Sequence, residues 1–237
     1  MSKPTIPHWT KHDDKMLRRA LASGASRRDL LRMMAAGGLT FAAGGALLGQ
    51  ASAALAAEPK SGGSIRVAGA TSSTADTLDP AISSNSTDYS RICACYNRLT
   101  FLDSEGVPQM ELAESIESDD AKVWTIKVRP GVTFHDGHTL SSADVVFSLK
   151  RHLDPAVGSK VNSIASQMSE IKAVDPQSVE VTLASANADL PVIFSLHHFM
   201  IVADGTTDFS KGNGTGAFVV EESSPGVRSI MTRNPNY

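Results

Sequence analysis

The chain has 237 residues and a mass of 25.0 kDa, which is enough for one ordinary domain or two small ones. Hydrophobic residues make up 41% and charged residues 20%, with 18 Gly and 11 Pro, so the composition excludes a collagen, a coiled coil and a wholly disordered chain. Two cysteines cannot build a disulfide scaffold. The net charge of -3 argues against a nucleic-acid partner, because few cations are left to neutralise phosphates.

The charge is divided unevenly along the chain. Residues 1–57 carry eight Lys and Arg against three Asp, a net +5, whereas the remainder carries fourteen basic and twenty-two acidic residues, a net −8. A basic head followed by an acidic body is typical of a targeting segment in front of a separately composed mature protein.

The basic head has the three parts of a secretory signal. Cations precede an uncharged stretch, Met33–Ala57, whose end is rich in small residues. Just before it, Ser26–Arg32 resembles the twin-arginine export consensus, with Arg27 and Arg28 as the paired arginines. We therefore predict that residues 1–57 are a twin-arginine signal peptide, cleaved after Ala56 or Ala57.

Three alternatives concern the same segment. A stretch of this length could anchor the chain in a membrane, but five glycines and the small residues disfavour insertion. Lipid attachment is disfavoured because Leu47-Leu48-Gly49 is followed by Gln50 instead of Cys. The long stretch before the apolar run leaves open whether translation starts at Met1 or Met16.

The mature part, taken in chain order, alternates short strands and helices. Trp124, Ile126 and Val128 share one face of the clearest strand, and Ser141 with Asp144 marks a helix start. That helix should turn Val145, Val146, Leu149 and Leu153 inward and end before Asp154-Pro155. The expected elements are a strand at 64–68, a polar loop at 71–87, a helix at 88–99, a strand at 123–128, a turn at 135–138, a helix from 141, a hairpin at 171–183, a helix at 190–196 and a hairpin at 217–232. This order predicts a mixed α and β fold with several antiparallel pairs.

Several motifs in this order resemble the bacterial extracytoplasmic solute-binding proteins of family 5, the peptide- and nickel-binding receptors of ABC importers. The motifs are Gly62–Ala68, Thr77–Ala81, Leu112–Ser115, Trp124–Gly137, Ala143–Arg151, Gly214–Phe218, Ser224–Gly226 and Arg233–Tyr237. Together they span nearly all of the mature chain. The block from Trp124 to Arg151 is the most distinctive, and an export signal is independent support.

The resemblance implies a type II periplasmic-binding-protein-like fold. Members of this family are more than twice as long, so residues 58–237 would form the first lobe, with 98–185 as an inserted subdomain and the second lobe missing. A ligand cleft forms between two lobes that hinge shut. The side chains that anchor peptide termini lie largely in the second lobe and are not transferred here.

The resemblance also implies the function. We expect a monomeric, non-enzymatic receptor in the periplasm or extracytoplasmic space, without a cofactor or lipid, that delivers peptides or similar solutes to an ABC permease. The export machinery would be a further partner. For ligand contact the resemblance points to two loops, Thr77, Leu78 and Asp79, and Thr215, Gly216 and Ala217. Gly216 could let a peptide main chain approach or could simply make a tight turn.

Other residues allow chemistry of a different class. His135 and His138 could be half of a metal site, although Phe-His-Asp-Gly is foremost a turn sequence, in which Gly137 supplies a positive φ. His197 and His198 would point to opposite sides of a strand.

Cys93 and Cys95 lie in a predicted helix. There a disulfide between them would be strained, so two half-buried thiols are favoured.

Two functional alternatives remain open at this point. One is a metal-dependent extracytoplasmic enzyme or a nickel-type binder that uses His135 and His138; the sequence has no Gly-x-Ser-x-Gly elbow to support catalysis by a serine. The other is a gene fragment without a function of its own.

Overall fold

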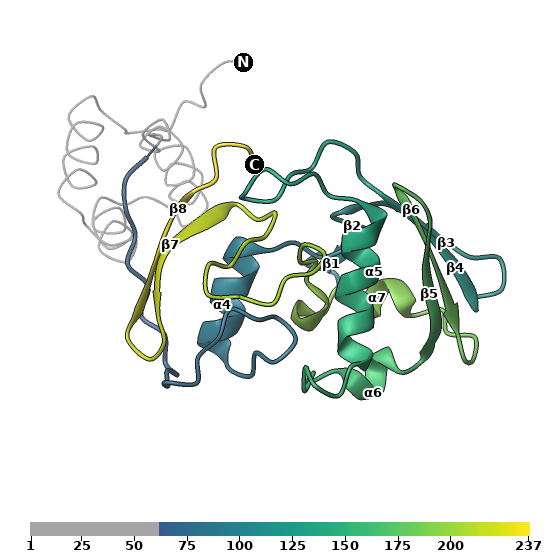
Figure 1. Cartoon of the computed structure of the whole chain (residues 1–237), viewed down its shortest axis with the longest axis horizontal. Coiled ribbons are helices and arrows are strands. Elements are labelled where there is room, and N and C mark those ends of the chain that lie inside the picture. Colours follow the sequence, from purple (N-terminus) through teal and green to yellow (C-terminus); the bar gives the residue numbers. More distant parts are fainter. Residues whose placement is uncertain (1–61) are drawn as a thin grey trace, which may run out of the picture. The chain divides into compact units, whose positions relative to one another are not determined.

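The computed structural model describes residues 62–237 (Figure 1). Every helix and strand below belongs to the compact unit Val67–Tyr237. The predicted export signal, with Arg27, Arg28 and the cleavage site, lies outside the described residues. Among those described, no helix combines the length and apolar character needed to span a membrane.

A four-stranded antiparallel sheet forms the larger core. Its spatial order is β3 (Ala113–Glu117), β4 (Val123–Val128), β6 (Ser178–Leu183) and β5 (Met168–Asp175). Trp124, Ile126 and Val128 on β4 are buried while the residues between them are exposed. The alternation in the sequence therefore predicted both this strand and its inner face, and the β5–β6 hairpin is confirmed as well.

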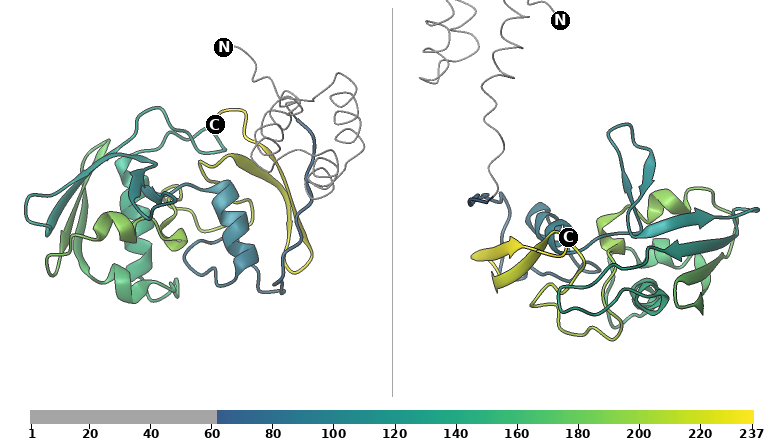
Figure 2. Two further views of the ribbon diagram at one scale, coloured as in Figure 1. Left: turned by 180° about the vertical axis from the view of Figure 1, so that it is seen from behind. Right: turned by 90° about the horizontal axis from the view of Figure 1, so that it is seen from above.

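Helix α5 (Ser142–Lys150) packs against β5 and β6 (Figures 1 and 2). Val145 and Leu149 are fully buried, as expected, and a short 3-10 helix, η1 (Arg151–Leu153), ends the element before Asp154. Pro155 explains why this helical segment ends before Asp154, because the residue before a proline is disfavoured in helical conformation. Helix α6 (Asn162–Ala165) follows η1.

Asp144 fixes the start of α5. Its carboxylate is completely buried and accepts hydrogen bonds from the Ser141 backbone N–H and hydroxyl, both at 2.8 Å. The backbone N–H of Asp204, sixty residues further along, donates to the same carboxylate at 2.8 Å. One turn later, the Ser148 hydroxyl accepts from the Val202 backbone N–H at 2.9 Å. The segment 202–204 is thereby attached to α5.

A second, smaller core surrounds helix α4 (Ser86–Cys95), whose side chains Ile92 and Cys95 pack with Tyr96, Met200 and Val202. The hairpin of β7 (Phe218–Ser224) and β8 (Arg228–Arg233) lies beside α4 (Figure 1). The remaining elements are β1 (Thr100–Leu102), β2 (Pro108–Met110), α7 (Leu190–Ile193) and the 3-10 helix η2 (His197–Phe199).

Asp76 connects the loop before α4 to the tip of the β7–β8 hairpin. It accepts from the Ser73 N–H at 2.9 Å, the Arg91 guanidinium at 2.9 Å and the Gly226 N–H at 3.4 Å. Burial opposes ionisation, but the hydrogen bonds, led by that from Arg91, outweigh it and lower the pKa of Asp76 to about 2. Asp76 therefore stays ionised in the folded protein at any ordinary pH.

Three sequence predictions differ from the structure. Residues 64–68 form no strand: Val67 is 81% exposed and pairs with no strand of the described residues. An extended segment without a ladder partner gains no hydrogen bonds, so alternation alone does not make it a strand. The helices predicted at 88–99 and 190–196 are shorter than expected, ending at Cys95 and Ile193.

The prediction for His197 and His198 is also wrong. They lie in a 3-10 helix, with their ring centroids 5.8 Å apart, and do not point to opposite sides of a strand. The Tyr89 ring packs against both histidines, with centroids 4.3 Å and 5.6 Å away. This tertiary contact with α4 has no counterpart in the local pattern.

His152 makes the larger core sensitive to acid. It is 1% exposed, packs edge-on against Phe199, and burial together with the charge of Arg151 lowers its pKa to about 4. Because the folded state resists protonation, we expect stability to be lost as the pH falls from 6.5 through 4, by roughly 3 kcal/mol. Urea unfolding at several pH values measures this. In the His152→Gln variant, the free energy of unfolding should fall by that much less over the same pH interval. If the variant and the wild type lose the same amount, the assignment is contradicted.

Candidate functional site

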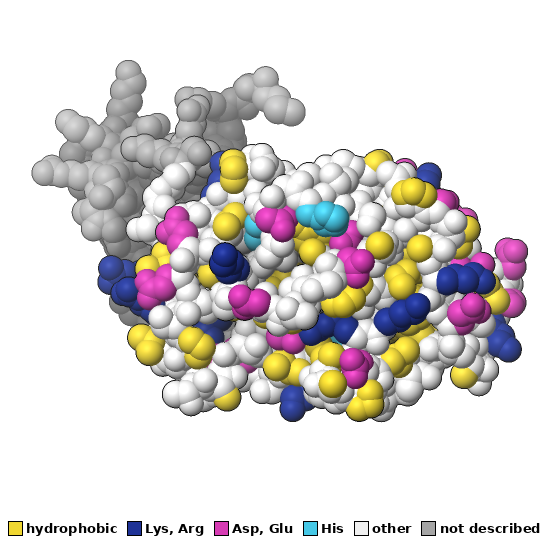
Figure 3. Space-filling model, in the orientation of Figure 1, with side chains coloured by type: hydrophobic (Ala, Val, Ile, Leu, Met, Phe, Trp, Pro, Cys, Tyr) yellow, Lys and Arg dark blue, Asp and Glu magenta, His cyan; other side chains and the backbone are white. Residues whose placement is uncertain are grey.

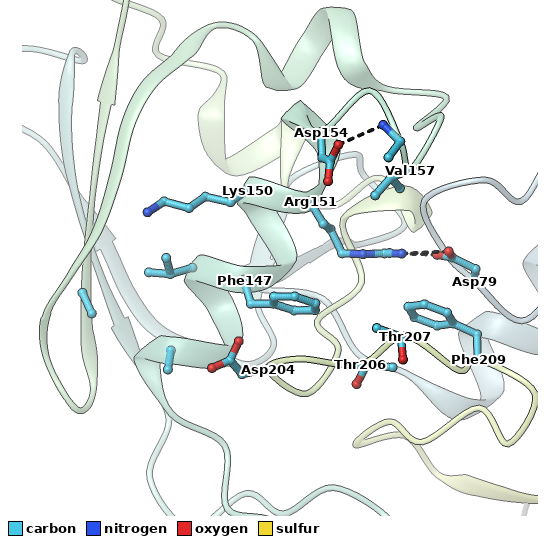
Figure 4. Close-up of a pocket in the computed structure, with 14 residues that line it drawn as sticks. Asp79, Phe147, Lys150, Arg151, Asp154, Val157, Asp204, Thr206, Thr207 and Phe209 are labelled. Atoms are coloured by element: carbon cyan, nitrogen blue, oxygen red, sulfur yellow. Dashed lines mark hydrogen bonds and ion pairs between the residues drawn. The ribbon is translucent and has the colours of Figure 1, made fainter.

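An open groove of about 800 Å³ runs beside α5, where the two cores meet (Figure 4). Its walls come from α5 and η1, from residues 154–157, from β5, from the segment 204–209 and from Asp79 in the loop before α4. Figure 3 shows this face, where hydrophobic and charged side chains mix. The lining residues are Asp79, Ala143, Val146, Phe147, Lys150, Arg151, Asp154, Ala156, Val157, Ala173, Asp204, Thr206, Thr207 and Phe209.

An ion pair crosses one wall of the groove. The Arg151 guanidinium binds both carboxylate oxygens of Asp79, at 2.8 Å and 2.7 Å, and the two side chains are only 8% and 11% exposed. The Phe209 ring lies 4.5 Å from the guanidinium carbon, a cation–π contact. Two parallel hydrogen bonds and a covering ring hold both charges in one geometry.

The turn around Pro80 explains how Asp79 reaches Arg151. The Thr77 hydroxyl accepts from the Asp79 N–H at 3.0 Å, and an Asp79 oxygen accepts from the Ala81 N–H at 2.9 Å. Leu78 points into the protein and is 4% exposed. Of the first predicted ligand loop, Asp79 therefore lines the groove, while Thr77 supports the turn and Leu78 anchors it.

Two phenyl rings give the groove its apolar surface. Phe147 of α5 and Phe209 are half-buried, and both pack against the smaller core around α4. In Figure 4 both rings lie on the same side of α5 as Arg151. Phe147 thus leaves the larger core and is available to line a site.

The second predicted ligand loop lies elsewhere, against the end of α4. Thr215 is buried and donates to Asn97 at 3.0 Å. The Gly216 N–H donates to Cys95 O at 2.8 Å, and its carbonyl accepts from the Asn234 side chain at 3.0 Å. A Cβ at Gly216 would come within 2.5 Å of the Cys95 backbone carbon, so close packing requires glycine here.

The geometry of Gly216 bears on the predicted peptide contact. Since both its N–H and its carbonyl have partners within the protein, its backbone has little left to offer an incoming strand. Thr215, Gly216 and Ala217 do not line the groove, and the structure does not bring the two predicted loops into one site.

The histidines of the 135–138 turn have partners inside the protein. The His135 ring Nε2 lies 3.0 Å from Gly216 O, and the His138 ring Nε2 lies 3.1 Å from the buried Asp144 carboxylate. Gly137 has φ 90° and Asp136 accepts from the His138 N–H at 2.9 Å, which confirms the turn. Within residues 62–237 no three His, Cys, Asp or Glu side chains come together in a way that could hold a metal ion.

The two cysteines are not joined in a disulfide. Cys93 is exposed whereas Cys95 is fully buried, so the expectation of two half-buried thiols is corrected to one exposed and one buried. Helical side chains two positions apart diverge, which explains the difference. Burial raises the pKa of the Cys95 thiol to about 12, so this thiol is unreactive at neutral pH.

Sequence reasoning missed Phe147, Arg151 and Phe209. The helical pattern showed that Phe147 lies off the inward face of α5, but an off-face phenyl ring is common at protein surfaces. Nothing in the sequence joins Arg151 to Asp79, seventy-two positions away. The strongest available signal was that an aromatic residue, Phe147, is followed by two cations, Lys150 and Arg151, about one helical turn later.

Comparison with known proteins gives a consistent answer. The family model "Bacterial extracellular solute-binding proteins, family 5 Middle" matches residues 107–237. A 108-residue stretch is 34% identical to the glutathione-binding protein GsiB of Escherichia coli K12, covering 45% of this chain and 21% of that protein.

Solved structures show the same likeness. The chain is similar to the binding protein AgaA of A. tumefaciens R10 in complex with agropinic acid, at TM-score 0.62 and 29% identity, covering 68% of this chain and 34% of that one. It is also similar to a nickel ABC transporter protein of Bacillus halodurans, at TM-score 0.58 and 28% identity, with 68% and 33% coverage. The matched region is therefore about a third of the length of these relatives.

The Asp79–Arg151 pair should matter for stability as well as for the groove. Asp79→Asn leaves a buried guanidinium without its charged partner, so we expect a loss of roughly 3 kcal/mol in the free energy of unfolding, measured in urea. Glu222→Gln is the matched control, because it breaks an Arg pair at 2.9 Å whose side chains are 38% and 62% exposed, and should barely change stability. Equal effects of both substitutions would contradict the assignment.

Proposed function

The chain belongs to the bacterial extracellular solute-binding proteins of family 5, and from this premise we propose that it forms the first lobe of an extracytoplasmic receptor that delivers small solutes to an ABC permease. The observation that carries the proposal is the family match over residues 107–237, supported by the fold similarity to complete binding proteins. Peptides or peptide-like compounds are the proposed solutes, since relatives are named for glutathione and for an oligopeptide.

The groove beside α5 is the proposed contribution of this lobe to solute binding. It is concave, lined by apolar rings and by a few charged groups, the composition usual in small-molecule sites. The chain corresponds to 34% of the AgaA structure, so a receptor of that size would need a second lobe to close over the solute. Residues 98–185, which contain the four-stranded sheet and α5, are proposed as the inserted subdomain of the first lobe.

A binding role, rather than an enzymatic one, is supported by the relatives, which are named as solute-binding proteins. The histidine alternative gains no support from the geometry, because His135 and His138 each face a partner within the protein. Zinc or nickel retained in stoichiometric amount after purification would reverse this judgement, as would substrate turnover.

The first experiment is recovery of the native protein from the extracytoplasmic fraction of its source cells, followed by intact mass measurement and identification of any solute released on denaturation. We expect the protein in that fraction, with a peptide-like solute if the mass exceeds twice 25.0 kDa. If the mass instead matches residues 58–237, calorimetry should detect no peptide binding at micromolar affinity or better, because a single lobe cannot enclose a peptide. A protein found only in the cytoplasm would overturn the proposal.

The export signal is tested separately. Arg27→Lys combined with Arg28→Lys should abolish export and leave the precursor inside the cell, because the pair is read by a receptor as an address. Fractionation followed by immunoblotting measures this. Arg18→Lys combined with Arg19→Lys is the matched control, since it changes another arginine pair of the same basic region. Normal export of the first variant would exclude the twin-arginine route.

A further inference from the structure

The loop around Asn213 is attached to the turn 135–138 by a set of short contacts. The Asn213 side-chain amide donates to the Asp136 carboxylate at 2.8 Å, and its oxygen accepts from the Asp136 backbone N–H at 3.2 Å. The Gly214 carbonyl accepts from the His135 N–H at 2.8 Å. Two consecutive residues of the loop therefore face two consecutive residues of the turn.

The hydrogen bonds of His135 fix which of its ring nitrogens carries the hydrogen. Nε2 lies 3.0 Å from the Gly216 carbonyl oxygen, and because a carbonyl oxygen only accepts, Nε2 is the donor. In the neutral imidazole Nδ1 then keeps a free electron pair, and the Gly214 backbone N–H donates to it at 3.4 Å. A base thus faces the backbone amide that follows Asn213.

Asn213-Gly214 is a dipeptide in which such a base can start a reaction, and the sequence contains it once. The nitrogen of the residue after an asparagine can attack the side-chain carbonyl carbon, and glycine hinders the approach least because it has no Cβ. The negative charge that develops on the Asn213 oxygen would be stabilised by the Asp136 N–H, which already donates to that oxygen. The turn therefore offers both a base and an oxyanion donor.

Packing keeps glycine at position 214. A Cβ there would overlap the Cys95 carbonyl oxygen and come within 2.5 Å of the Tyr96 ring, so no larger residue fits. Gly214 is buried, whereas Asn213 is half-buried and Asp136 is exposed, so water can reach the side-chain amide. The fold thus requires the more reactive dipeptide at a place where the reaction can be completed by water.

We propose that Asn213 is a self-modifying site, at which the folded protein converts this asparagine into aspartate or isoaspartate through a cyclic imide. His135 Nδ1 takes the proton of the Gly214 nitrogen, and that nitrogen forms a bond to Asn213 Cγ. The bond from Cγ to Nδ2 breaks with its electron pair on Nδ2, which takes up the proton and leaves as ammonia. Water then adds to one of the two imide carbonyl carbons and opens the ring.

The product weakens the attachment of the loop to the turn. An aspartate at position 213 has no N–H to donate, so a second carboxylate lies against Asp136 where the amide lay at 2.8 Å. Like charges at that distance repel each other. The modification is independent of the proposed solute-binding function, since it needs only the folded chain and water.

Ageing of the folded 237-residue chain at neutral pH, followed by trypsin digestion and mass spectrometry, tests the proposal. The tryptic peptide 212–228 has Asn213 as its only amide side chain, so a mass gain equal to the difference between an amide and an acid belongs to this residue. The same chain unfolded in urea is the reference, because there the dipeptide is present without His135 beside it. We expect the folded chain to react at least about tenfold faster. An equal or slower rate in the folded chain would overturn the proposal.

Two histidines of the same turn identify the base. His135→Gln removes it and should slow the reaction of the folded chain at least about tenfold. His138→Gln is the matched control, because its ring lies 3.1 Å from the Asp144 carboxylate, away from the base position, and should leave the rate unchanged. Equal rates in His135→Gln and the wild type, or equal losses in both variants, would contradict the role of His135. If His135→Gln does not fold, the comparison of folded and unfolded wild-type chains still decides.

Hydroxylamine present during ageing detects the intermediate. It attacks a cyclic imide and cleaves the chain there, so fragments that begin at Gly214 should accumulate in the folded wild type and not in His135→Gln. A mass gain at Asn213 without such cleavage would mean that water hydrolyses the side-chain amide directly, and the cyclic route would be excluded.

Discussion

The buried carboxylate of Asp144 is the constraint on which the arrangement of the site depends. A carboxylate with no exposed surface must have its hydrogen bonds satisfied inside the protein. Here its partners are Ser141 at the start of α5, the backbone N–H of Asp204 and the ring Nε2 of His138. Together with the Ser148–Val202 contact, this ties the segment 202–204 to one side of the helix. Thr206, Thr207 and Phe209 follow directly and form the far wall of the groove.

The groove exists because two cores meet without merging. The larger core lies between the sheet and α5, and the smaller one surrounds α4, while Phe147 reaches from α5 to the smaller core. Arg151 and Asp79 cross the junction as a bidentate pair. Such a pair fixes the relative orientation of the two side chains but adds little net stability, since both charges lose their hydrating water when they are buried.

A solute receptor needs a surface that is shaped before the solute arrives and is completed by closure. The groove meets the first requirement, because two hydrogen bonds hold the Asp79–Arg151 pair in one geometry and both phenyl rings pack against the smaller core. Relatives about twice as long as this chain indicate how the second could be met.

The sequence by itself determined the elements whose signals are local. The alternation in β4, the Ser141–Asp144 helix start, the stop before Pro155 and both later hairpins all follow from neighbours along the chain, and all are present. The family was also readable from the sequence, because its motifs are contiguous. Only the tertiary structure decided that residues 64–68 form no strand, that His197 and His198 gather beside Tyr89, and that Asp79 meets Arg151. Each of these depends on which distant partner is present, and a local pattern carries no information about that partner.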